Sequence, residues 1–160
     1  MKKKLLFTIF LLTCGICHAQ TITISNGAGS SWTISPLAST ITKAGKNYEH
    51  IEVTQASHTL LTVNSLLLWT VSVQQVAGSN WDPALKVSVR RSGDGGGSAI
   101  LGGNYNYILL TNMNQAIVSG LLGLVFSRTN MPFQYKVEGL SVIIPAKTYT
   151  TTILYTIVGL

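Results

Sequence analysis

A period-two alternation of side chains runs through most of this chain and constrains its fold more than any other sequence feature. Across 149–158, odd positions hold tyrosine, threonine and isoleucine, while even positions hold threonine, leucine and valine. Such alternation in β-branched and aromatic residues predicts β-strands. No segment combines a helical period with helix caps, so we expect an all-β fold.

Clusters of Gly, Asn, Ser and Pro separate the alternating runs at short intervals and predict turns between them. Many short strands without helices favour one β-sandwich domain over 20–160, of the immunoglobulin-like Greek-key type. We expect seven to nine strands once some runs merge or drop out. The candidate runs are 21–25, 32–35, 48–54, 59–64, 67–76, 86–91, 105–110, 115–118, 122–127, 134–138, 140–144 and 150–158.

The last run, 150–158, carries no charged side chain on either face. A strand of this kind suits the inside of a sandwich, or a position against a partner, better than a solvated edge. The strongly apolar run ending in Trp69-Thr70-Val71-Ser72-Val73 has the same character, and we expect Trp69 in the core.

The first nineteen residues have the pattern of a secretory signal peptide cleaved before Gln20. Three lysines (2–4) precede an apolar run over 5–17, and Ala19 follows as a small residue. That run is too short for a membrane span, and no later one is long enough. We expect an exported protein that is extracellular, on the cell surface or periplasmic, without lipid anchoring at Cys14, because Thr13 is a poor residue before a lipidated cysteine.

Removing this leader changes the charge and the cysteine content. Eight basic and five acidic residues remain, and Arg90-Arg91 is the only adjacent basic pair, so we expect no nucleic-acid partner. Both cysteines, Cys14 and Cys17, lie in the leader. The mature chain would therefore have no disulfide and would depend on packing for its stability.

The residues available for catalysis are few. The glycine-rich stretch 93–98 lacks the lysine of a phosphate-binding loop and is expected to be a hairpin loop, and no Gly-x-Ser-x-Gly motif occurs. His50 and Glu52 share one face of a strand, but no third metal ligand is near, which favours a solvated face. We expect no enzyme, no catalytic residue, no metal site and no cofactor.

Three aromatic residues are the candidates for ligand binding: Trp81, Tyr105 and Tyr107. Trp81 lies in a Gly-Ser-Asn-Trp-Asp-Pro loop, and the tyrosines alternate with Asn104 and Asn106. Flat apolar faces beside amide donors suit a carbohydrate or protein surface. The alternative is that Trp81 covers the end of the core and that one tyrosine packs inward.

Two segments resemble bacterial exported β-sandwich proteins. The strand 68–73, and the ending that runs from Pro145 through Thr148-Tyr149-Thr150, are similar to WxL-type cell-surface domains, spore-coat-U-type secreted proteins and fimbrial subunits. The likeness extends loosely over 69–160, although Trp-x-Leu is absent, Lys147 replaces the usual glycine and cysteines are missing. The resemblance implies an immunoglobulin-like, non-enzymatic sandwich displayed on a surface or assembled in fibres.

Two functions therefore remain open. The first is a secreted or cell-surface structural or adhesion-type protein, such as a pilin-like subunit, which associates with itself or with a protein partner through β-strand pairing. The alternative is a small carbohydrate- or ligand-binding module that uses the loop aromatics.

Overall fold

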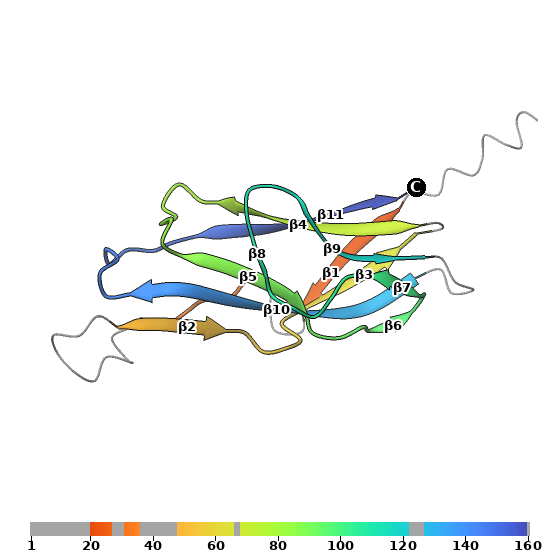
Figure 1. The fold of residues 1–160 in the computed structure, drawn as a ribbon, viewed down its shortest axis with the longest axis horizontal. Coiled ribbons are helices and arrows are strands. Elements are labelled where there is room, and N and C mark those ends of the chain that lie inside the picture. The colour runs from red at the N-terminus through yellow and green to blue at the C-terminus, as the bar shows by residue number, and fades with distance from the viewer. Residues whose placement is uncertain (1–19, 27–30, 36–47, 66–67, 122–126, 160) are drawn as a thin grey trace, which may run out of the picture.

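The computed structural model of this chain contains two antiparallel β-sheets that pack against each other (Figure 1). It describes residues 20–26, 31–35, 48–65, 68–121 and 127–159, and within these ranges every regular element is a strand. This part of the chain accordingly has no helix that could cross a membrane. The signal peptide expected over 1–19, with Cys14, lies outside the described residues.

The larger sheet, sheet A, is built around one long strand, β10 (Ser127–Ser141). Two strands lie in succession along one side of β10 and two along the other, and two more complete the sheet. The order β1-β3-β10-β5-β8, with β2 and β6 also on β10, joins segments far apart in sequence. These strands are β1 (Thr21–Asn26), β2 (Glu49–Val53), β3 (Thr59–Asn64), β5 (Lys86–Arg91), β6 (Gly96–Gly97) and β8 (Ile108–Leu109).

The second sheet, sheet B, has the order β11-β4-β9-β7. Its strands are β4 (Trp69–Ala77), β7 (Ile100–Gly102), β9 (Gln115–Gly120) and β11 (Thr151–Gly159). β11 pairs with β4 in unbroken register from Thr151↔Ala77 to Gly159↔Trp69. The β4–β9 and β7–β9 pairs each contain a register shift, so β11–β4 is the most regular pair of this sheet.

The core fills the space between the two sheets. Alternate residues of β4 face inward, and Trp69, Val71 and Val73 are buried, which confirms the prediction for Trp69. Gly120 of β9 lies opposite Trp69, and a Cβ at that position would collide with the indole ring. The largest fully buried side chains are those of Phe133, Leu61, Ile117, Met131, Val63, Val71, Val73, Val89 and Val118.

One buried hydrogen-bond network joins the two sheets. The hydroxyl oxygens of Tyr135 in β10 and Tyr155 in β11 are 2.9 Å apart, and Tyr135 also donates to Thr59 Oγ1 at 3.1 Å. His58 Nδ1 lies 3.2 Å from the same Thr59 oxygen, and its ring stands edge-on to Tyr135. Burial lowers the pKa of His58 and raises the pKa of both tyrosines. The network therefore consists of uncharged groups, which suits a buried site.

The strand predicted over 32–35 is wrong, because 31–35 have no ladder partner. Trp32 and Ile34 nevertheless pack against the core, and the Trp32 ring stands edge-on to His58. Alternation of apolar and polar residues predicts which side chains face the core. The pattern does not predict whether the backbone pairs with a neighbouring strand, because that pairing depends on tertiary structure.

Other expected runs are changed in length or number. Run 134–138 and the first two residues of run 140–144 are parts of the one strand β10, which bends at Gly139 (φ 84°), where its register against β2 shifts. The rest of the second prediction is wrong, because β10 ends at Ser141 and 142–144 form a turn. A positive φ is easily adopted by glycine, so Gly139 marks a bulge within the strand and not its end. Run 105–110 is reduced to β8, and 122–126 lie outside the described residues. The described ranges hold eleven strands, against the seven to nine expected.

The final strand is not enclosed by the sandwich. The run 150–158 corresponds to β11, which is an edge strand: β4 is its only partner among the described strands. The expectation of an interior place is therefore wrong, and the alternative of a place against a partner stays a prediction. β1, an edge strand of sheet A, contacts β11 (Figure 1). The side chain of Gln20 lies beside Gly159.

Candidate functional site

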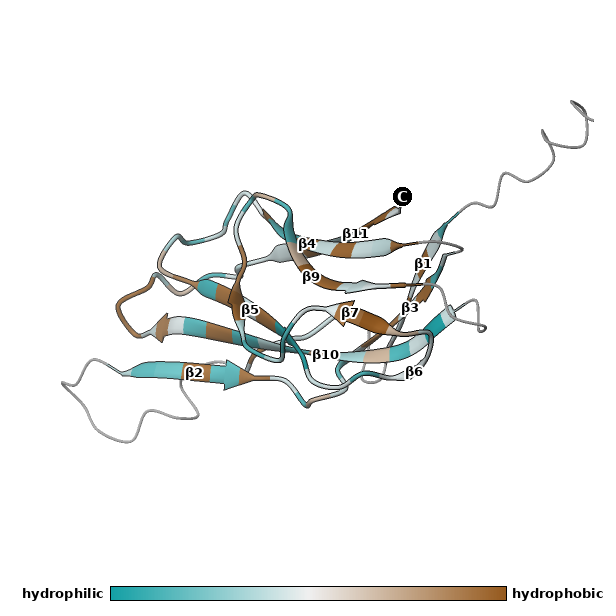
Figure 2. Cartoon of the chain, turned by 45° about the vertical axis from the view of Figure 1, so that its right-hand side comes forward, coloured by the Kyte–Doolittle hydropathy of each residue, from teal (hydrophilic) through white to brown (hydrophobic). Residues whose placement is uncertain are grey.

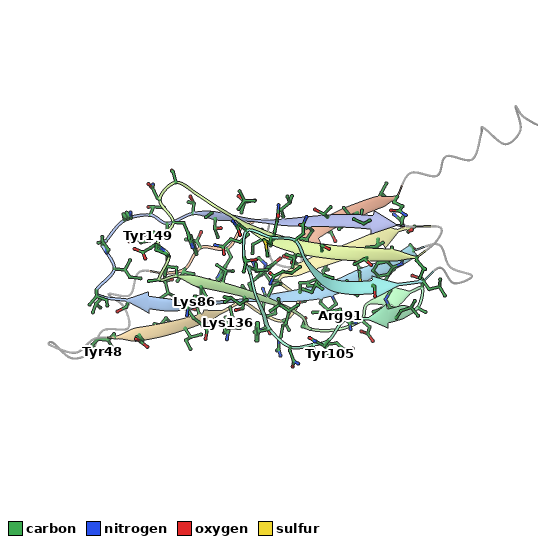
Figure 3. The ribbon with its side chains drawn as sticks, turned by 45° about the horizontal axis from the view of Figure 1, so that its top comes forward. Tyr48, Lys86, Arg91, Tyr105, Lys136 and Tyr149 are labelled. Atoms are coloured by element: carbon green, nitrogen blue, oxygen red, sulfur yellow. The ribbon has the colours of Figure 1, made fainter. Side chains whose placement is uncertain are left out.

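Tyr105 is half-exposed and is held at the surface by two charged residues. Its hydroxyl donates to Asp94 Oδ1 at 2.7 Å, and the Arg91 guanidinium lies 4.5 Å from the centre of its ring. Arg91 also forms an ion pair with Asp94. The hydrogen bond from Tyr105, together with the nearby arginines, lowers the pKa of Asp94. Figure 3 shows Arg91 and Tyr105 near each other at the carboxyl end of β5.

The glycine-rich segment beside this group is organised by a buried arginine. Arg128 of β10 donates from Nε to the Asp94 carbonyl at 2.7 Å, and from its terminal nitrogens to the carbonyls of Gly95, Gly97 and Ser98. Part of the expected hairpin loop is thus the short strand β6, paired with β10. This role of Arg128 could not be predicted from the sequence, because its partners are backbone carbonyls about thirty residues away, which have no sequence signature.

Tyr107 lies on the outer side of sheet A between two cationic side chains. The Arg90 guanidinium is 4.8 Å from the centre of its ring, and Lys136 Nζ is 5.0 Å from it. The Tyr107 hydroxyl donates to Gln134 Oε1 at 3.1 Å, and Arg90 Nε donates to the same oxygen at 2.8 Å. Gln134 is itself fixed, because its amide nitrogen donates to the Thr54 carbonyl at 2.6 Å.

Trp81 has a different environment. It is partly buried and packs against the core, in the turn between β4 and β5, where its backbone nitrogen donates to the Gly78 carbonyl. The structure thus holds Tyr105 and Tyr107 in one loop beside consecutive arginines of β5, and places Trp81 in the turn before that strand. The alternative reading of Trp81, as a cover for the core, agrees with this position.

His50 and Glu52 share a face of β2, as expected, and are joined by a hydrogen bond between His50 Nε2 and Glu52 Oε1 at 2.7 Å, with about a third of each side chain exposed. No group of three or more potential metal ligands occurs within the described ranges. A mutual hydrogen bond accounts for the two side chains.

Charge is divided unequally between the two sheets. The strands of sheet B contain no charged residue, whereas β2, β5 and β10 of sheet A carry all the charged strand residues in the described part. Figure 2 shows hydrophilic colour over much of β2 and on parts of β5 and β10. The molecule therefore presents one charged layer and one uncharged layer.

Comparison with protein-family models, with curated proteins and with solved structures found no match to this chain.

Proposed function

We propose that this protein is an exported, non-enzymatic structural or adhesion-type subunit, which is pilin-like and associates by pairing a β-strand of another molecule with β11. The proposal includes the signal peptide over 1–19 and the immunoglobulin-like Greek-key arrangement of the sandwich. The observation that carries it is the uncharged edge of β11, which has no ladder partner on its outer side among the described strands.

β11 lacks the features that commonly protect an edge strand from pairing. Such features are short length, charged side chains, proline and bulges. β11 spans Thr151–Gly159, contains no charge and no proline, and keeps one register against β4 throughout. The opposite edge of sheet B differs, because β7 has three residues and its register against β9 is shifted. Association is therefore expected at β11 and not at β7.

The surroundings of β11 also favour a protein partner. Leu154 and Val158 of β11 and Val76 of β4 are 44%, 59% and 48% exposed, on a sheet without charges. The neighbouring edge strand β1 carries no charge either. Burying this side of the sandwich would remove apolar surface from water and would leave no charge to desolvate.

The test is the oligomeric state of the protein across a wide concentration range, by light scattering with electron microscopy of the same samples. We expect fibres or defined oligomers, and we expect Leu154→Lys to weaken association at least tenfold, because a lysine on an edge strand opposes pairing. Leu101→Lys on β7, where Leu101 is 59% exposed, is the matched control and should leave association unchanged. A wild-type protein that stays monomeric at every concentration would overturn the proposal.

The ligand-binding alternative is favoured by a specific observation, the fixed positions of Tyr105 and Tyr107 at the surface. Under this alternative, a glycan array should show binding that is lost on Tyr105→Ala or Tyr107→Ala. Trp81→Ala distinguishes the wider three-residue surface from one made by the tyrosines alone. Absence of binding to every glycan would remove this function.

A further inference from the structure

The outer face of sheet A carries a row of cations over neighbouring strands. Lys86 and Arg90 lie four residues apart on β5, and Lys136 of β10 pairs with Ser88 between them. Residues two apart on one face of a strand are separated by about 6.7 Å, so the row extends for about 13 Å. Figure 3 shows Lys86 and Lys136 close together on this face.

Within this row the positive charges are only partly balanced. Glu138 forms an ion pair with Lys136 at 2.9 Å and lies across from Lys86 in the register. Arg90 lies across from Gln134, which is uncharged, and has no ion pair among the described residues. The charge of Arg90 is thus available to an external anion.

The Arg90 side chain is also held in one orientation. Its Nε is bonded to Gln134, and its guanidinium lies against Tyr107, which is bonded to the same Gln134 oxygen. Its terminal nitrogens have no hydrogen-bond partner in the described part of the chain. A fixed guanidinium whose two terminal NH2 groups are free of partners in the described part of the chain matches the geometry of a carboxylate and loses little rotamer entropy on binding.

We propose that Arg90 and Lys136, together with Tyr107, form a binding site for the carboxylates of an acidic polysaccharide. The guanidinium of Arg90 receives one carboxylate through paired hydrogen bonds, and Lys136 attracts that group or the next one along the polymer. The middle of this face is covered, since Ser88 and Gln134 are buried, and Arg90 and Lys136 are partly exposed. Cations spaced over about 13 Å suit a polymer that carries successive carboxylates. Single-stranded nucleic acid fits less well, because it is usually bound by aromatic rings free to stack on bases, and the Tyr107 ring is occupied by two cations.

The site is independent of the β11 edge and gives the ligand-binding alternative a definite chemistry. The probe is polygalacturonate, titrated into the purified protein by calorimetry at low and moderate salt. Fully methyl-esterified polygalacturonate is the matched control ligand, because it keeps the backbone and lacks the charge. We expect binding to the acid form only, weakening as salt rises.

Arg90→Gln removes the guanidinium and is expected to weaken binding at least about tenfold. If circular dichroism shows that Arg90→Gln alters the fold, Lys136→Gln is the second variant. It is expected to weaken binding severalfold. Lys147→Gln, which removes one positive charge beside Tyr149 in the segment before β11, is the control and should change affinity less than twofold.

Four results would overturn the site. The first is no binding of polygalacturonate by the wild-type protein. The second is an equal loss in Lys147→Gln and Arg90→Gln, which would indicate attraction by net charge alone. The third is binding of single-stranded DNA as tightly as polygalacturonate, with the same dependence on Arg90. This result would assign the site to another polymer. Binding of the methyl ester as tightly as the acid would also refute it, yet would leave the wider glycan-binding alternative standing.

Discussion

The hydroxyl pair of Tyr135 and Tyr155 provides a quantitative test of how the two sheets are held together. Tyr155→Phe removes the 2.9 Å contact between the hydroxyls but leaves Tyr135 bonded to Thr59. One neutral hydrogen bond is lost and no donor is stranded, so the free energy of unfolding should fall by about 1 kcal/mol. Tyr135→Phe removes both bonds and leaves the buried Tyr155 hydroxyl without a partner among the described residues. It should cost about 2 kcal/mol.

The double variant makes the test sharper. If the two hydroxyls act through one shared bond, Tyr135→Phe/Tyr155→Phe should cost about 2 kcal/mol, which is less than the sum of the single changes, with a coupling energy of about 1 kcal/mol. Urea denaturation with linear extrapolation gives these values, and an unchanged m-value shows that the folded and unfolded states keep their compactness.

The control is Tyr149→Phe, because the Tyr149 hydroxyl donates to the Pro145 carbonyl at an exposed site. We expect no measurable change for this variant, since water replaces the lost bond. A coupling energy of zero, or a Tyr155→Phe variant that is less stable than Tyr135→Phe, would refute the reasoning.

Three further predictions concern the interior and the glycine-rich segment. Burial raises the pKa of Tyr135 and Tyr155, so the unfolded chain loses these protons at lower pH than the folded chain. The free energy of unfolding should therefore fall as pH rises above about 10. In the double phenylalanine variant, the urea midpoint should fall less steeply between pH 8 and pH 11. Arg128→Met leaves four carbonyl oxygens without the arginine as donor and should lower the free energy of unfolding by about 3 kcal/mol. Proteolytic cleavage over 93–98 should also become faster. Unchanged cleavage would count against this role of Arg128. Gly97→Ala should destabilise by about 1–3 kcal/mol, because φ is 106° there and a Cβ would collide with a backbone carbonyl, whereas Gly96→Ala has room and should be near neutral in the same denaturation assay.

Much of the fold could be predicted because strands have a local signature. The runs 59–64 and 86–91 match β3 and β5, since alternation and β-branched residues act over a few neighbours. The inward positions of Trp69, Val71 and Val73 follow from the same period. The failure over 32–35 has a physical reason: inward-facing side chains do not require a paired backbone.

The candidate site was predictable only in part. Tyr105 and Tyr107 were found from composition and loop context, but their partners Arg90 and Arg91 were noted only as an adjacent basic pair. Consecutive residues of a strand point to opposite faces, so one arginine meets Tyr105 and Asp94 while the other meets Tyr107. That division depends on how the loop 103–107 crosses the end of β5, which involves pairings distant in sequence.

The sequence by itself determined the all-β class, the places of most strands and the absence of charge from the final strand, because each depends on a residue and its near neighbours. Only the tertiary structure decided that this strand lies at an edge, that the charged strands gather in one sheet, and that Arg90 is left with an uncharged neighbour. Sheet order and register set these features. They arise from contacts between segments up to about ninety residues apart, and no local pattern encodes them.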